Sequence, residues 1–296
     1  MLPSRILSQI TRQNLQFTSG YSVQTVKLPK QHEWNRAIAS AERLVGFPTS
    51  AYHLKTLFSE DANVTEHVRK LMGSDHPVLK SFKRLIIQGG QNNVQVRGLM
   101  MLLMAKSLNL KSPQALNSDE LDESTGVLIQ QRKLAEIVEM ISAAFSIHKS
   151  VMNLPYELPD PTDKEAKEDL LQLEYGNKIA ILGGDYLLAN ACVGLAALRN
   201  TYIVEMISIA IGEFTQSEFH GKRDVQGRLI PDEDSICINA WTSRNKLASG
   251  SLLASGFKGI GMLIDLPDDL TEKTEKIGRH LALALQAFIG NVQLEH

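Results

Sequence analysis

The feature that most constrains how this 296-residue chain can fold is the spacing of its ten prolines. None lies between Pro113 and Pro155, and none lies between Pro161 and Pro231. Helix interiors exclude proline, because it lacks a backbone amide donor and clashes with the preceding turn. The two proline-free stretches therefore have room for long, uninterrupted helices.

The apolar residues inside these stretches recur with helical spacing. Residues 134–148 and 203–214 follow the i, i+3, i+4, i+7 pattern of an amphipathic helix. Residues 185–198 are apolar on nearly every side, which is typical of a helix buried in the fold or in a subunit interface. Clean period-two alternation and Asn-Gly or Asp-Gly hairpin turns are missing from the sequence. We predict an all-α fold, with loops at 153–169 and 221–234.

Composition excludes several classes of protein. The chain is 43% hydrophobic with a formal net charge of -2, so it lacks the basic surface of a nucleic-acid-binding protein. Its two cysteines, Cys192 and Cys237, form no disulfide framework and match no zinc-binding spacing. No run of 18 apolar residues indicates a membrane span. We therefore expect a soluble, intracellular protein that has no transmembrane segment and binds no nucleic acid.

The first 32 residues have a composition of their own. They are rich in Ser, Thr and Gln, and no acidic residue precedes Glu33. Their four basic residues are Arg5, Arg12, Lys27 and Lys30. This composition is typical of a mitochondrial transit peptide, with a merely disordered tail as the alternative. We predict a transit peptide at 1–32, a location in the mitochondrial matrix, and one helical domain at 33–296.

Four short motifs, taken in order, resemble the trans-polyprenyl diphosphate synthase family. Residues 181–189 read Ile-Leu-Gly-Gly-Asp-Tyr-Leu-Leu-Ala, which resembles the family's Gly-Asp-Tyr-Leu-Leu-Ala signature. Residues 211–216 resemble its Gly-Glu-x-x-Gln segment, 246–248 its Lys-Thr-Ala helix, and 278–286 the helix that enters its second aspartate-rich motif. The resemblance extends from about Trp34 to the end of the chain. It implies the isoprenoid synthase helical bundle, which we expect to be incomplete at the C-terminus.

The resemblance also shows where this chain departs from active family members. Those members bind diphosphate through Mg²⁺ ions held by two Asp-Asp-x-x-Asp motifs, since Mg²⁺ prefers carboxylate, phosphate and water oxygens. At the position of the first motif this chain has Lys149, Ser150 and Asn153. A lysine there repels Mg²⁺. We therefore predict a degenerate motif, no metal site, no bound cofactor and no catalytic residue in this chain.

Two further parts of the family's active site have changed. The basic motif Gly-Gly-Lys-Arg-x-Arg-Pro is replaced by Asn-Asn-Val-Gln-Val-Arg-Gly at 92–98, which retains only Arg97. Residues 287–293, where the second aspartate-rich motif is expected, contain no acidic residue. Arg97 and Lys246 remain as possible contacts for a diphosphate. The alternative is that both are inherited without a ligand.

This combination resembles the subunit that lacks aspartate-rich motifs in heteromeric members of the family. It implies a non-catalytic subunit that assembles with a catalytic subunit 1, as heterodimer or heterotetramer, in a mitochondrial decaprenyl or solanesyl diphosphate synthase. The product would supply the ubiquinone side chain, and Mg²⁺ is expected in the catalytic partner. The alternative function is a stand-alone isoprenoid-binding scaffold without catalysis. The resemblance implies a subunit interface at Asp185, Tyr186, Leu187, Asn190, Ile203 and Ile207.

One polar stripe has two interpretations. Ser142, Ser146, Lys149 and Asn153 follow helical spacing along an otherwise apolar helix. The stripe either lines a remnant cavity that contacts a prenyl lipid or a phosphate, or is an ordinary solvated or interface face. The second interpretation is favoured because such faces are common.

Overall fold

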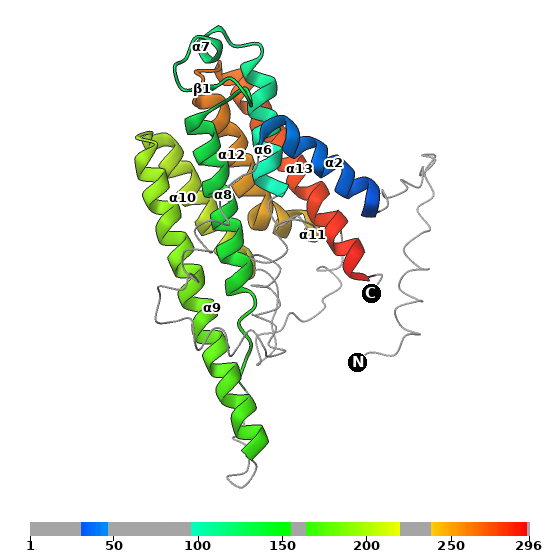
Figure 1. The fold of residues 1–296 in the computed structure, drawn as a ribbon. Coiled ribbons are helices and arrows are strands. Elements are labelled where there is room, and N and C mark those ends of the chain that lie inside the picture. Colours follow the sequence, from blue (N-terminus) through cyan, green and yellow to red (C-terminus); the bar gives the residue numbers. More distant parts are fainter. Residues whose placement is uncertain (1–30, 47–95, 155–163, 220–237, 295–296) are drawn as a thin grey trace, which may run out of the picture. The chain divides into compact units, whose positions relative to one another are not determined.

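The computed structural model describes residues 31–46, 96–154, 164–219 and 238–294. The chain divides into two compact units, 1–34 and 35–296, and nearly all described residues belong to the second. The described residues are mainly helical (Figure 1), in agreement with the all-α prediction. Residues 1–30 of the predicted transit peptide, the loop at 221–234 and the basic-motif positions 92–95 lie outside the described residues, whereas residues 31 and 32 begin α2.

The elements of the described residues are named in the order in which they occur along the chain. The helices are α2 (Gln31–Val45), α6 (Val96–Asn109), α7 (Pro113–Leu116), α8 (Ile129–His148), α9 (Lys164–Ala197), α10 (Thr201–Glu218), α11 (Ile238–Asn245), the π-helix η2 (Lys246–Gly250), α12 (Ser251–Met262) and α13 (Asp268–Leu294), and the strands are β1 (Leu121–Asp122) and β2 (Val127–Leu128).

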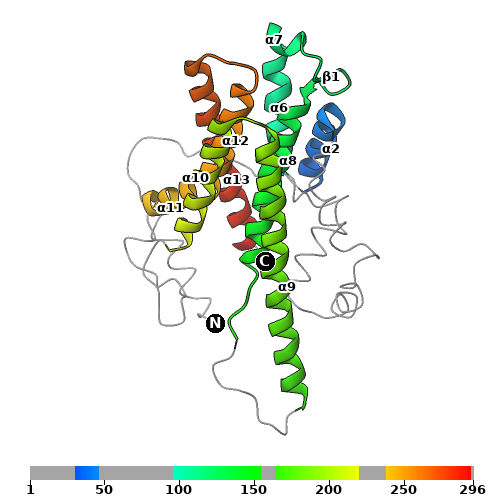
Figure 2. The ribbon, with the colours of Figure 1, turned by 90° about the vertical axis from the view of Figure 1, so that its left-hand side faces the viewer.

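Helix α8 is a central element of the core. It packs against α6, α9 and α12, and most of its side chains are buried. Figure 1 and Figure 2 both show α9 running alongside α8. Ala144 and Ile147 of α8 form one apolar cluster with Ala180 and Leu187 of α9. The apolar residues that recur with helical spacing at 134–148 lie on the face of α8 that makes these contacts.

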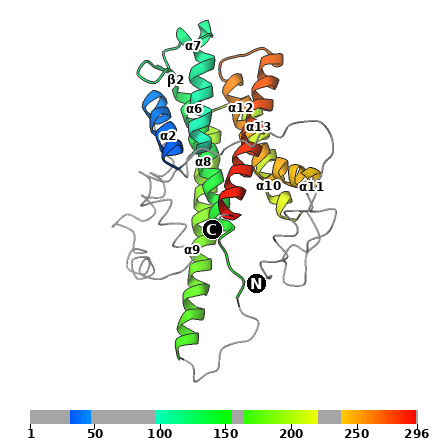
Figure 3. The same ribbon diagram turned by 90° about the vertical axis from the view of Figure 1, so that its right-hand side faces the viewer.

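Helix α12 is buried along nearly its whole length, and α13 lies beside it (Figure 3). Small residues allow the close approach of the two helices. A Cβ atom added at Gly278 would lie 2.8 Å from the Phe257 side chain and 2.9 Å from the Leu253 carbonyl oxygen. α12 also contacts α6, α8 and α10, so it joins helices from separate parts of the described chain to one core.

The ribbon of β1 and β2 is a small addition to the predicted all-α fold. Leu121 pairs with Leu128, and Asp122 pairs with Val127. The Asp122 carboxylate accepts hydrogen bonds from the hydroxyls of Ser124 and Thr125 at 2.7 and 2.8 Å. These bonds lower the pKa of Asp122 to about 2. The sequence lacked the usual hairpin dipeptides because the turn is longer than two residues and is held by a side chain.

The predicted helices at 134–148 and 203–214 are confirmed within α8 and α10. The predicted loop at 153–169 is wrong at its end, since α9 begins at Lys164.

One described helix segment, Ala166–Ala197, is long and apolar enough to cross a membrane by length and composition. Only 33% of its most apolar window is buried in the fold. Core helices of soluble proteins pass the same test. The expectation that the chain has no transmembrane segment stays a prediction.

Candidate functional site

The positions expected for the first metal motif lie where α8 ends. Helix α8 stops at His148, and Lys149 and Ser150 form the turn that follows. The Ser150 hydroxyl donates to the Ile147 carbonyl oxygen at 2.5 Å, and residues 151–154 have left the helix. Lys149, Ser150 and Asn153 therefore do not share one helical face. The polar stripe from Ser142 to Asn153 is broken as well, since Ser142 is buried and Ser146 is exposed.

The Lys149 side chain crosses from α8 to α10. Its Nζ atom lies 2.5 Å from the Glu218 Oε1 atom and 4.9 Å from the centroid of the Phe214 ring. The Phe214 ring stacks on Phe145 of α8, with 3.8 Å between the ring centroids. An ion pair, a cation–π contact and an aromatic stack thus join the ends of these two helices.

The groups at this position do not fit Mg²⁺, which requires an octahedral set of oxygen ligands. The side chain at the start of the motif is an ammonium group, and the carboxylate facing it, Glu218, is paired with that group. The described residues include no group of three or more His, Cys, Asp or Glu side chains arranged to hold a metal ion.

The Gly-Gly-Asp-Tyr motif has a clear structural role at the same end of α8. His148 Nε2 lies 3.3 Å from the Asp185 Oδ1 atom and 3.2 Å from the Ile181 carbonyl oxygen. The imidazole ring rests on Gly184, where an added Cβ atom would lie 2.1 Å from Nε2. Glycine at this position lets α9 approach the ring, and Asp185 then pairs with it.

We expect Gly184→Ala to destabilise the chain by about 1–2 kcal/mol, because the new methyl group displaces the His148 ring. Gly212→Ala on α10 is the matched control, since nothing lies within 4 Å of its added Cβ atom. That control should gain up to about 1 kcal/mol from helix propensity. Thermal or urea unfolding measures both. If the double variant His148→Ala/Gly184→Ala does not recover part of the loss, the steric explanation is wrong.

Arg97 lies in the first turn of α6 and is half-buried. The backbone amide of Gly98 donates to the Glu139 carboxylate of α8 at 2.6 Å. Burial raises the pKa of Glu139 to about 7, although the Arg97 charge and the amides of Gly98 and Arg97 act to lower it. The sequence analysis did not identify Glu139 as a candidate site residue. Its signal is a single acidic residue within the buried stripe 137–141.

Lys246, the second predicted diphosphate contact, is exposed at the start of η2. A π-helix is rare and often marks a functional site. The added Cβ atom of Gly250 would lie 3.9 Å from Arg279 Cγ, so η2 faces α13. The structure does not bring Lys246 together with Arg97 through any described contact. Whether either residue contacts a diphosphate stays a prediction.

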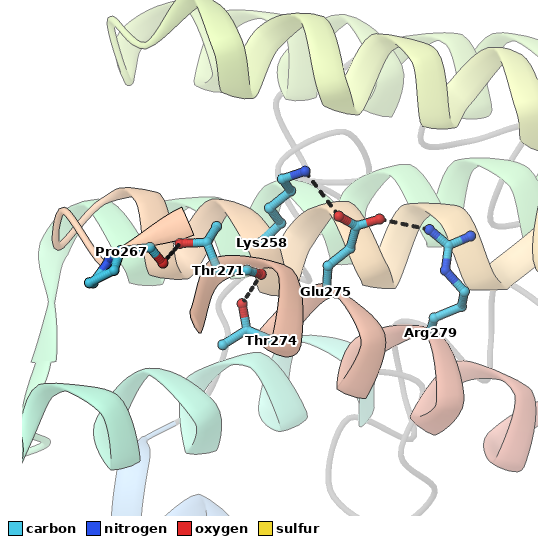
Figure 4. A network of polar contacts seen from close by, with 6 residues as sticks. All are labelled: Lys258, Pro267, Thr271, Thr274, Glu275 and Arg279. Atoms are coloured by element: carbon cyan, nitrogen blue, oxygen red, sulfur yellow. Dashed lines mark hydrogen bonds and ion pairs between the residues drawn. The ribbon is translucent and has the colours of Figure 1, made fainter. Parts of the chain in front are cut away.

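A second charged group lies between α12 and α13. Figure 4 shows the Glu275 carboxylate between Lys258 and Arg279, which donate to it at 3.0 and 2.8 Å. Burial alone would raise the pKa of Glu275, but the two cations lower it below its usual value. Thr271 and Thr274 continue the network toward Pro267 with hydroxyl-to-carbonyl bonds. This network joins α12 to α13. Lys258, Glu275 and Arg279 together have a net charge of +1.

The residues predicted for the subunit interface divide into two groups. Leu187, Ile203 and Ile207 are fully buried inside this chain, so their assignment to an intersubunit surface is corrected. The resemblance to the family identified them, but they lie on the face of each helix that packs on its own core. Asp185 is exposed, whereas Tyr186 and Asn190 are half-buried, and Asn190 donates to the Tyr186 carbonyl oxygen at 2.8 Å.

Other apolar residues of α9 and α10 are exposed instead. We call this set the α9–α10 surface, and it consists of Ile181, Leu182, Val193, Tyr202 and Ile209, with exposed fractions between 46% and 71%. Isolated exposed apolar residues are common, whereas several large ones on two consecutive helices make these helices candidates for an interaction. The signal in the sequence was apolar residues lying off the buried stripe of each helix.

Comparison with known proteins places the chain in a family. A family model described as polyprenyl synthetase matches residues 76–288. The chain belongs to the polyprenyl synthetase family. An isoprenoid synthase family member from Thermotoga neapolitana has a similar fold, with a TM-score of 0.53 at 16% sequence identity over 83% of this chain and 79% of that one. This likeness shows the isoprenoid synthase fold alone.

Two curated relatives are similar in sequence. The human protein named All trans-polyprenyl-diphosphate synthase PDSS2 is 35% identical over 254 residues, covering 85% of this chain and 61% of the relative. The Yarrowia lipolytica protein named Probable hexaprenyl pyrophosphate synthase, mitochondrial, is 26% identical over 312 residues, covering 87% of this chain and 66% of the relative. The chain thus spans slightly less than two thirds of the length of these relatives.

Proposed function

We propose that this chain is a non-catalytic subunit of a heteromeric trans-polyprenyl diphosphate synthase. The observation that carries the proposal is Lys149, a cation paired with Glu218 at the position expected for the family's first metal motif. The catalytic partner would be a homologue that has both aspartate-rich motifs and binds Mg²⁺. Its product, a decaprenyl or solanesyl diphosphate, would supply the side chain of ubiquinone.

The proposed location is the mitochondrial matrix. Residues 1–32 contain Ser and Arg but no acidic residue, and this composition supports the proposal that they form an import signal. The name of the Yarrowia lipolytica relative, which describes that protein as mitochondrial, supports the same location.

The α9–α10 surface is the proposed site for the partner. Val193 and Tyr202 are the most exposed members of this set, with exposed fractions of 70% and 71%. Permanent subunit interfaces are more hydrophobic than ordinary protein surface, because they resemble a domain core cut in half. In the isolated chain these apolar side chains are exposed to water. Their burial against a second helical bundle would explain why they are apolar.

Restoring the aspartates should not restore activity. We expect Lys149→Asp/Ser150→Asp/Asn153→Asp to remain inactive and to lose about 1–3 kcal/mol of stability. The new carboxylate at 149 would face Glu218, and the Ser150 hydroxyl bond to Ile147 would be lost. Unfolding with and without Mg²⁺, together with an elongation assay, measures this. Mg²⁺-dependent turnover by the triple variant would contradict the interpretation of the site.

Co-purification tests the proposal against the scaffold alternative. The chain is expressed with a family member that has both aspartate-rich motifs, and a tag on one protein is used to isolate the pair. We expect a stoichiometric complex that persists through size-exclusion chromatography. Absence of a complex, together with tight binding of a prenyl diphosphate by the isolated chain, would favour a stand-alone isoprenoid-binding scaffold.

A further inference from the structure

The α9–α10 surface is formed by two helices that diverge from the short turn between them at 198–200. Figure 2 shows α10 leading away from α9 toward α11. Because the helices diverge, the shape of the surface depends on the angle between them. Contacts near the turn constrain this angle poorly, whereas contacts at the far end of α10 constrain it well.

Helix α9 is fixed to α8 along much of its length. Gly184 lies against the His148 ring, and Gly194 lies against Ile137, where added Cβ atoms would be 2.1 and 2.9 Å from the nearest side-chain atoms. The apolar cluster of Ala144 and Ile147 with α9 lies in the same interface. Helices α8 and α9 therefore act as one rigid pair, and fixing α10 to α8 also fixes it relative to α9.

Helix α10 is attached at both of its ends. Its N-terminal half packs into the core through the fully buried Ile203 and Ile207. Near its C-terminal end, the Glu213 carboxylate accepts a hydrogen bond from the Ser251 hydroxyl of α12. Its last turns meet α8 through the Phe145–Phe214 stack and the Lys149–Glu218 pair.

We propose that Lys149 is the positioning residue of a latch, formed with Phe145, Phe214 and Glu218, that sets the angle between α9 and α10 and so shapes the α9–α10 surface. This lysine lies where the resemblance places an aspartate. An aspartate there would repel Glu218, whereas lysine pairs with it and lies over the Phe214 ring. The replacement thus both removes a metal ligand and joins two helices. The link to a partner rests on the proposed function, but the effect on the helix angle does not.

The competing explanation is an ordinary surface ion pair. The side chains of Lys149 and Glu218 are 48% and 45% exposed, and such pairs contribute little to stability by themselves. An ordinary pair would leave the helix angle and the partner affinity unchanged when it is removed. The latch predicts a change in both.

The first measurement is the distance between spin labels on α9 and α10 in the isolated full chain, by pulsed electron paramagnetic resonance. The exposed Cys192 takes one label and Gln216→Cys takes the other, in a Cys237→Ser background. We expect a narrow distance distribution that broadens in Lys149→Met and narrows again in the charge swap Lys149→Glu/Glu218→Lys. Lys273→Met is the matched control, since Lys273 pairs with Asp269 at 3.1 Å on α13. An unchanged distribution in Lys149→Met overturns the latch.

The second measurement is affinity for the catalytic partner. We expect Lys149→Met to bind about tenfold more weakly, the size expected for losing an exposed ion pair together with a cation–π contact. The charge swap should recover most of this loss, and Lys273→Met should bind normally. A broadened distribution with unchanged affinity would overturn the link to the partner. If the wild-type chain binds no partner, the proposed function fails, whereas the distance measurement still decides the latch.

Discussion

The double variant Val193→Asp/Ile209→Asp is expected to bind the catalytic partner about 100-fold more weakly than wild type, or not at all. The two side chains are 70% and 56% exposed in this chain, so their replacement leaves the isolated fold intact. In a complex, each new carboxylate would be buried without a partner, which is strongly unfavourable. Isothermal titration calorimetry or biolayer interferometry measures the loss.

Leu110→Asp is the matched control for this experiment. Leu110 is 66% exposed, and it follows α6 rather than lying on α9 or α10. Circular dichroism and thermal unfolding should show all three proteins folded. Equal loss of binding in the control, or wild-type affinity in the double variant, would show that the partner does not use the α9–α10 surface.

Glu139→Gln is expected to make the chain more stable than wild type above pH 7, by up to roughly 3 kcal/mol. Burial raises the pKa of Glu139 from its usual 4.5 to about 7 in the folded chain. The folded state therefore holds the proton more tightly than the unfolded state. The corresponding stability is fully present below about pH 4.5 and is lost as the pH rises through about 7.

Glutamine is neutral at every pH and still accepts the bond from Gly98, so the variant should lack this dependence. Arg97 is the charged group that lowers the pKa of Glu139, and its contribution is already included in the net shift. Urea unfolding at a series of pH values from 4.5 to 8 measures the difference between the two proteins. The exposed Glu174→Gln serves as the control. Equal stability of wild type and Glu139→Gln at pH 8 would contradict a buried carboxylate with a raised pKa.

The helices of this fold were predictable because their signals are local. Proline-free stretches and a 3.6-residue apolar period identify α8 and α10 directly. The same period places Ile207 on the apolar stripe of α10 and Ile209 off it, but it does not say which side of the helix faces this chain's own core. Ile207 is fully buried, whereas Ile209 is 56% exposed. That difference depends on the neighbours of the helix, which a single sequence does not contain.

The sequence predicted where along the chain the candidate site lies, but not which side chains meet there. The sequence placed the altered motif at Lys149 and predicted that a cation there repels Mg²⁺. It did not find Glu218, because the pair joins residues 69 positions apart on two helices. The end of α8 at His148 agrees with the apolar period at 134–148, whereas the bond from the Ser150 hydroxyl to the Ile147 carbonyl oxygen could not be predicted.

The central claim is that this chain contributes structure to an enzyme whose chemistry occurs in its partner. The most direct measurement is Mg²⁺-dependent elongation of farnesyl diphosphate with isopentenyl diphosphate by three samples: the purified chain alone, the catalytic homologue alone, and the co-purified pair. We predict no product from the chain alone and the highest activity from the pair. Sustained turnover by the isolated chain, or equal activity of the homologue with and without it, would contradict the account.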